Sequence, residues 1–271
     1  MRVGLVQLSG SSDPVANLPK TMELIAKAAH DGAAFVLTPE VTNIIGANRA
    51  KQDAVLSHEA DDITLTALRR QASALNIWIL IGSLAVKTDD ADGRFANRSF
   101  LIDPTGTVRA RYDKIHMFDV QVSETEVYRE SQNYRPGEKA SVAGMGEIDL
   151  GMSICYDIRF PHLYRDLAMA GANVIAVPAA MSPVTGPAHI ETLLRARAIE
   201  TGCYMLMPSQ TGDHGTRSTW GHSMAVSPWG ELLFDMGTDV GFRCLDLDLN
   251  AVKEARAKIP SLMNAQPYQS P

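Results

Sequence analysis

Short apolar runs of strand length alternate with segments of helical periodicity along almost the whole chain. This alternation is typical of layered folds in which helices cover the faces of β-sheets. The predicted helices are Leu18–His30, Ile63–Leu75, Pro161–Ala170, Pro187–Thr201 and Ala251–Lys258. The predicted strands are Val3–Leu8, Ala34–Leu37, Ile77–Leu84, Arg98–Ile102, Val108–Tyr112, Ile148–Ile154, Asn173–Val177, Cys203–Met207, His222–Ser227, Leu232–Asp235 and Phe242–Leu249.

The composition is that of a globular protein and narrows the choice of partners. The 271 residues are 45% hydrophobic and 21% charged, and the net charge is −6. A negative chain is not attracted to nucleic acid or to anionic lipid in general. The longest apolar runs, such as Ile77–Leu84, are far shorter than a membrane-spanning helix, and the N-terminus resembles a strand and not a signal peptide. We therefore expect no nucleic-acid or membrane partner, a cytoplasmic location and a single domain over residues 1–271.

Several common catalytic signatures are missing from the sequence. It contains no GxGxxG, no GxxxxGK[ST], no GxSxG and no HExxH. The three cysteines form no CxxC pair, so neither a disulfide framework nor a zinc ribbon is indicated. The sequence therefore predicts no cofactor and no metal.

Cys155 is the strongest candidate nucleophile. It follows the predicted strand Ile148–Ile154 and precedes a predicted helix by one short turn. A helix N-terminus near the thiol would lower its pKa and favour the reactive thiolate. The alternative is a small buried side chain, the ordinary role of a free cysteine, and Cys203 and Cys244 are given that interpretation.

Two charged residues occupy positions that resemble that of Cys155. Glu40 follows the apolar segment ending in Leu37, and Lys114 follows the strand Val108–Tyr112. Side chains at strand ends from distant parts of a sequence often meet at one edge of a sheet. Each residue alone is ordinarily just solvated, but the three together predict one pocket.

The motifs around Glu40, Lys114 and Cys155 resemble those of the nitrilase superfamily of carbon–nitrogen hydrolases. The Glu-Lys-Cys triad of that superfamily is matched by TPE ending in Glu40, RYDKIHMFDV containing Lys114 and GMSICYDIRFP containing Cys155. A second family glutamate is matched by Glu130. The stretches PVTGPAHIETLLRARAIETGCY and GHSMAVSPWG resemble Nit-type amidases, especially deaminated-glutathione amidases. Ile190 and Met181 depart from aromatic residues that are frequent in the family.

The resemblance implies a fold and an assembly. The expected fold is an α+β protein, an αββα sandwich of the nitrilase type that becomes four-layered as a homodimer. The apolar helix near Leu193 and Leu194 is the expected interface. The polar segment Val120–Lys139 is a candidate covering loop.

The resemblance also assigns chemical roles. Cys155 would attack an amide carbonyl, Glu40 would transfer protons, and Lys114 with the backbone N–H of Tyr156 would stabilise the oxyanion. Glu130 would position Lys114 or the substrate nitrogen.

Substrate contacts are predicted for three more residues. These are Arg159, Thr185 and His189, although Arg159, like Asp157, also suits a bracing role in the turn after Cys155.

The predicted reaction converts a small carboxylate-bearing linear amide, similar to deaminated glutathione, to an acid and ammonia through a thioester. Alternatives within the enzyme class are an ω-amidase acting on α-ketoacid amides and an N-carbamoyl amino acid hydrolase. A relative that transfers the acyl group to an amine, or that only binds, is the alternative outside hydrolysis.

Overall fold

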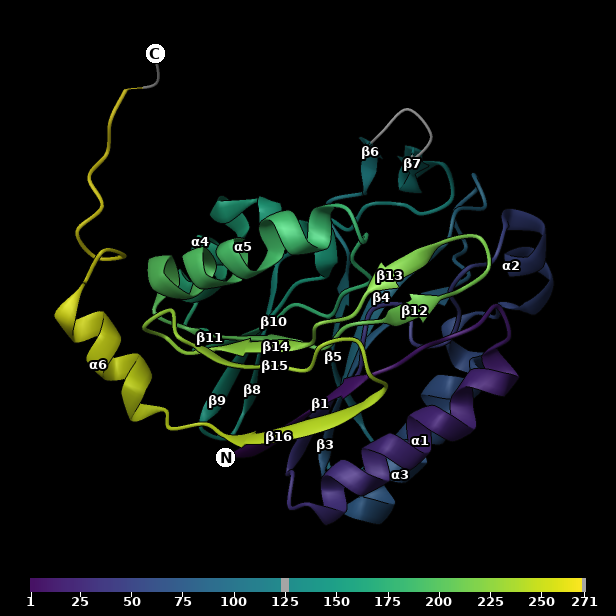
Figure 1. Ribbon diagram of the computed structural model, residues 1–271, viewed down its shortest axis with the longest axis horizontal. Helices are drawn as coiled ribbons and strands as arrows, with labels where there is room; N and C mark the ends of the chain where they lie inside the picture. The colour runs from purple at the N-terminus through teal and green to yellow at the C-terminus, as the bar shows by residue number, and fades with distance from the viewer. Residues whose placement is uncertain (123–126, 270–271) are drawn as a thin grey trace.

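Two six-stranded sheets lie face to face in the computed structural model, which describes residues 1–122 and 127–269 (Figure 1). The first sheet has the order β16 (Gly241–Asp246), β1 (Arg2–Gln7), β2 (Phe35–Leu37), β3 (Trp78–Val86), β4 (Ala96–Ile102) and β5 (Val108–Asp113). The second has the order β15 (Leu232–Asp235), β14 (Met224–Val226), β11 (Tyr204–Met207), β10 (Val174–Ala176), β9 (Ile148–Met152) and β8 (Ser141–Met145).

Helices cover the outer faces of both sheets and complete the predicted αββα order. The longer helices are α1 (Pro14–His30) and α3 (Ile63–Leu75) on the first sheet, and α4 (Pro161–Met169) and α5 (Thr185–Thr201) on the second (Figure 1). Shorter elements are α2 (Arg49–Val55), α6 (Asn250–Lys258), the hairpins β6 (Asp119–Gln121) with β7 (Val127–Arg129) and β12 (Thr211–Asp213) with β13 (Ser218–Trp220), and the 3₁₀ helices Glu59–Asp61, Glu130–Gln132 and Cys155–Arg159. The predicted α+β sandwich is confirmed.

Alternation along the strands explains why their sequences are apolar on both faces. In β2, Phe35 and Leu37 pack in the core between the sheets, whereas Val36 packs in the core beneath α1 and α3. Strands covered on both sides lose the usual polar alternation and become continuous apolar runs. The same packing explains the apolar composition of β3 and β10.

The two sheets approach each other closely beside the segment that carries Glu40. A Cβ atom at Gly82 of β3 would lie 2.0 Å from the carbonyl oxygen of Thr38 and 2.5 Å from Cβ of Pro178. Only glycine fits this position, so the ends of β2 and β10 come together across the sandwich.

The two leucines that mark the expected interface helix face the core of the chain. Leu194 is completely buried in the core, and Leu193 is partly buried against the same core. These leucines attach α5 to its own sheet, so Leu194 is not available to a partner, and an interface at this helix stays a prediction. The exposed apolar side chain on α5 is Ile199, at 55% exposure.

Several regular elements were not predicted from the sequence, and the hairpin β6–β7 is one of them. Helix α2, strand β8 and the hairpin β12–β13 are short and carry small or polar residues with no clear periodicity. No helix in the two described stretches has both the length and the apolar character needed to cross a membrane.

Candidate active site

Three strand ends bring Glu40, Lys114 and Cys155 to the wall of one cavity. Glu40 lies three residues beyond β2, Lys114 directly beyond β5, and Cys155 three residues beyond β9. The cavity has a volume of about 510 Å³. The structure therefore places together the three side chains that the strand-end argument grouped.

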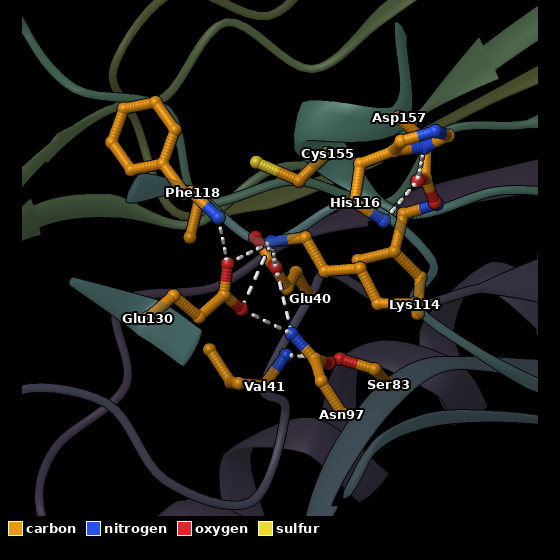
Figure 2. A network of polar contacts seen from close by, with 12 residues as sticks. Glu40, Val41, Ser83, Asn97, Lys114, His116, Phe118, Glu130, Cys155 and Asp157 are labelled. Atoms are coloured by element: carbon orange, nitrogen blue, oxygen red, sulfur yellow. Dashed lines mark hydrogen bonds and ion pairs between the residues drawn. The ribbon is translucent and has the colours of Figure 1, made fainter. Parts of the chain in front are cut away.

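Lys114 is the centre of an ion-pair network. Its Nζ donates to Oε1 of Glu40 at 2.9 Å and to Oε1 and Oε2 of Glu130 at 3.0 and 2.8 Å (Figure 2). The Lys114 side chain is 2% exposed, so the ammonium depends on these carboxylates for its solvation. Two carboxylates therefore hold one ammonium group.

Asn97 of β4 ties the two glutamates to each other. Its Nδ2 donates to Oε1 of Glu40 at 2.9 Å and to Oε1 of Glu130 at 3.2 Å. Phe118 contributes a backbone N–H that donates to Oε2 of Glu130 at 2.6 Å. Because these donors fix both carboxylates, the network is rigid before any substrate arrives.

Two residues at the site have left-handed backbone conformations. Cys155 has φ +50°, and its N–H donates to the carbonyl oxygen of Pro178 at 2.9 Å. Val41, which follows Glu40, has φ +46°, and its N–H donates to Oγ of Ser83 at 2.7 Å. This conformation is strained for a β-branched residue, and such strain gathers at functional sites.

The expected lowering of the Cys155 pKa is wrong. Burial raises the pKa of the thiol well above its ordinary range, and the nearby Glu40 carboxylate raises it further, while Lys114 opposes these effects incompletely. Cys155 is the first residue of a five-residue 3₁₀ helix, and the α-helix begins only at Pro161. The resting thiol is therefore protonated and needs a base.

The acid and the amine of the network keep their charges. Burial by itself would raise the pKa of the Glu40 carboxyl, but Lys114 outweighs it, so this pKa lies below its ordinary value. Burial would lower the pKa of Lys114, but Glu130 and Glu40 raise it well above the ordinary value. A negative Glu40 beside a neutral thiol is the arrangement that proton transfer requires.

Asp157 braces the turn that carries Cys155, as the sequence indicated. It is fully buried and accepts from the N–H of Ile154 at 2.9 Å and from the hydroxyl of Tyr112 at 2.7 Å. It also accepts from the N–H of His116 at 3.0 Å and contacts that imidazole at 2.7 Å. The loops after β5 and β9 are thus joined.

The residues expected to contact substrate lie at different depths. Tyr156, Arg159 and Thr185 line the cavity. Tyr156 is the second residue of its 3₁₀ helix, where an N–H has no acceptor within the helix. His189 is exposed on α5 and is outside the cavity wall formed by the described residues; it contacts Arg159 at 3.3 Å.

The two residues that depart from the family pattern both line the cavity. The sulfur of Met181 lies 3.8 Å from Sγ of Cys155. Ile190 is fully buried on α5. Aliphatic side chains therefore stand close to the thiol.

The segment Val120–Lys139 is more regular than the expected loop. It includes most of the β6–β7 hairpin and the 3₁₀ helix of Glu130, and residues 123–126 lie outside the described residues. Val127, Tyr128 and Arg129 line the cavity beside Glu130. Movement of this segment as a lid stays a prediction.

The sequence interpretation missed several polar residues of the cavity wall, and two of them bear on the charged network. Asn97 immediately precedes the predicted strand Arg98–Ile102, and Arg217 lies between β12 and β13 and lines the cavity. Neither residue lies in a pattern that signals chemistry. Only the pairing of distant strands reveals them.

Comparisons with known proteins agree with this geometry. The carbon–nitrogen hydrolase family model matches residues 2–257. The chain belongs to the carbon–nitrogen hydrolase family. A deaminated glutathione amidase of Yersinia enterocolitica is 39% identical over 97% of this chain and 92% of its own length.

Solved structures of family members share the fold. The C. elegans NitFhit protein gives a TM-score of 0.87 at 32% identity, covering 98% of this chain and 65% of that longer protein. An amidase from Nesterenkonia sp. AN1 gives 0.79 at 28% identity, covering 96% and 98%, and carries acrylamide on its active-site cysteine. The chain is a hydrolase that acts on amide carbon–nitrogen bonds.

Proposed function

We propose that this family member hydrolyses a small carboxylate-bearing linear amide, such as deaminated glutathione, with Cys155 as the nucleophile. The observation that carries the proposal is the buried Lys114 ammonium, held within 3.0 Å of both Glu40 and Glu130 in the cavity that Cys155 lines. The relatives named deaminated glutathione amidase, at 34–39% identity, support the substrate class.

Acylation begins with proton transfer from the thiol to Glu40. The sulfur attacks the amide carbonyl carbon, and the carbonyl oxygen becomes an oxyanion that Lys114 and the N–H of Tyr156 stabilise. The C–N bond then breaks as Glu40 returns the proton to the nitrogen. The acyl group remains on Cys155 as a thioester.

Deacylation repeats the proton transfers with water. Glu40 takes a proton from water, the hydroxide oxygen attacks the thioester carbon, and the C–S bond breaks as sulfur regains the proton. The product that left during acylation is ammonia from a primary amide, or an amine from a substituted amide such as that between the α-ketoglutaryl and cysteinyl groups of deaminated glutathione. Glu130 keeps Lys114 in place throughout and takes no part in the proton transfers.

The test measures release of the α-ketoacid and of the amine from deaminated glutathione. We expect Cys155→Ala and Lys114→Ala to keep the fold and to lose at least about 100-fold in turnover. Cys244→Ala and Lys253→Ala are the matched controls, because these residues lie away from the cavity and outside the ion-pair network, and both should retain activity. Full activity in either active-site variant would refute the mechanism.

A substrate panel separates the alternatives. Preference for α-ketoglutaramate or α-ketosuccinamate identifies an ω-amidase, and release of carbon dioxide with ammonia from N-carbamoyl amino acids identifies a carbamoylase. A trapped acyl adduct on Cys155 that reacts with amines faster than with water identifies a transferase. An adduct-free, inactive protein that still binds these ligands identifies a binding-only relative.

We also propose that the protein is a cytoplasmic homodimer that associates through the outer side of α5. Ile199 and Trp229 are exposed by 55% and 53%, and Ile199 lies against the turn at Gly230. Light scattering should show a dimer that Ile199→Asp dissociates, whereas Ile259→Asp, also at an exposed isoleucine, should leave it intact. A monomeric wild-type protein contradicts the proposal.

A further inference from the structure

Arg217 brings a positive charge to the wall of the active-site cavity. It lies between β12 and β13, and its Nη2 donates to the carbonyl oxygen of Ala180 at 2.7 Å. The residue after Ala180 is Met181, whose sulfur contacts the sulfur of Cys155. The Arg217 guanidinium also stands over the Tyr128 ring, with Cζ 5.5 Å from the ring centroid.

This guanidinium is incompletely satisfied. Arginine has five N–H donors, and within the described residues that of Arg217 makes one hydrogen bond and no ion pair with a carboxylate within 4.0 Å. Its buried Nε finds no hydrogen-bond acceptor among them. Its charge also favours the ionised form of Glu40, which places it within electrostatic range of the reacting groups.

The other cations of the cavity wall are Lys114, Arg129 and Arg159, and each is differently engaged. Arg159 contacts the exposed His189 at 3.3 Å and lies over the Tyr156 ring, and none of its nitrogens is a buried donor without an acceptor among the described residues. Lys114 is occupied by Glu40 and Glu130. Arg129 is exposed and donates to the carbonyl oxygens of Val120 and Tyr128. Arg217 is thus the guanidinium that combines a fixed position, a buried unsatisfied donor and proximity to Glu40.

We propose that Arg217 binds a carboxylate of the substrate and makes the enzyme selective for anionic amides, an inference that rests on the proposed function. Guanidinium donors match a carboxylate in two parallel hydrogen bonds, and a fixed arginine loses little freedom when it binds. The Ala180 and Tyr128 contacts supply this fixation. Arg217 acts in binding and orientation, while Cys155, Glu40 and Lys114 perform the bond changes.

The test compares an anionic amide with a neutral amide of the same chain length, α-ketoglutaramate and valeramide, in the full-length protein. Arg217→Gln should raise KM for α-ketoglutaramate by about 10- to 100-fold, the loss typical of a charged hydrogen bond. Its kcat should stay within about threefold, and its KM for valeramide should change far less than its KM for α-ketoglutaramate. Arg217→Lys should recover part of the preference for the anionic amide. Arg109→Gln, at an exposed arginine of β5, is the control and should keep the wild-type KM for α-ketoglutaramate.

Equal losses on both amides, or an unchanged KM for α-ketoglutaramate, overturn the assignment of Arg217. A wild-type enzyme that hydrolyses neither amide, nor deaminated glutathione, contradicts the proposed function instead. If Arg217→Gln does not fold, calorimetry with 2-oxoglutarate decides the question. Cys155→Ala should bind this product more tightly than Cys155→Ala with Arg217→Lys, and equal affinities overturn the proposal.

Discussion

Asp157, two residues beyond Cys155, accepts a hydrogen bond at 3.0 Å from the N–H of His116, two residues beyond Lys114. The nucleophile and the ammonium therefore come from loops that share one buried carboxylate. The imidazole of His116 contacts the same oxygen at 2.7 Å and stacks on Phe160 with centroids 3.5 Å apart. This relationship holds the two halves of the sandwich in register at the site.

Asp157→Asn should damage both stability and catalysis. The asparagine side chain has one acceptor oxygen, whereas the donors from Tyr112, His116 and Ile154 share the two oxygens of the carboxylate. The variant also loses a buried charged hydrogen bond. We expect a loss of about 2–4 kcal/mol in the free energy of unfolding, measured by urea denaturation, and at least a tenfold lower kcat in the folded enzyme. Asp166→Asn, at an exposed position of α4, should change neither quantity. Wild-type turnover in the Asp157 variant would show that the brace does not set the geometry.

Asn97 separates the effect of hydrogen bonding from that of charge. Asn97→Ala removes the donor that both glutamates share and should lower kcat about tenfold. Asn97→Asp adds a third carboxylate beside them, and like charges in a buried site repel. The aspartate variant should therefore be less stable than the alanine variant, by about 1–3 kcal/mol in unfolding free energy. The reverse order in urea denaturation contradicts this account.

The layers of the fold were predictable because buried helices and strands have a periodic pattern of apolar residues in the sequence. Helix Ile63–Leu75 has the predicted bounds, and Asp62 caps it by accepting from the N–H of Leu65 at 2.8 Å. Strand β8 has no such pattern, because its sequence SVAGM consists mainly of small residues that are only partly buried. Leu194 shows a different limit: an apolar residue on a helix indicates burial, but not whether its own core or a second copy covers it.

The sequence was enough to predict which three charged or nucleophilic residues form the site, but not the pKa of the thiol. Glu40, Lys114 and Cys155 each end an extended segment, which is a local feature that topology converts into proximity. The pKa of Cys155 depends on burial and on a carboxylate 115 positions away in the sequence, so a strand-turn-helix pattern gave the wrong sign. Arg217 and Asn97 have no distinguishing local context at all.

The raised pKa of Cys155 predicts a thiol that stays protonated in the free enzyme. Ultraviolet absorbance of the thiolate, taken as wild type minus Cys155→Ala, should not rise between about pH 7 and pH 9. The half-buried Cys244, whose pKa burial raises to about 11, is removed in both proteins by Cys244→Ala so that it does not contribute. In Glu40→Gln the raising effect of the carboxylate is lost, and thiolate should appear at lower pH than in the wild type. Thiolate absorbance near neutral pH in the wild type contradicts the assignment of Glu40 as the proton acceptor.

The lowered pKa of Glu40 makes stability depend on pH in a defined direction. A carboxyl whose pKa is lower in the folded state than its ordinary value of 4.5 contributes stability above 4.5, and that contribution disappears as the pH falls through the folded pKa. The difference in unfolding free energy between the wild type and Glu40→Gln should therefore be largest near pH 7, at about 1–3 kcal/mol, and should shrink in acid. Urea denaturation at decreasing pH, continued while both proteins remain folded, measures this difference. Glu23→Gln, at an exposed pair on α1, should show no such dependence on pH, because exposed ion pairs contribute little to stability. A Glu40 difference that grows as the pH falls would mean that burial, and not Lys114, dominates this carboxyl.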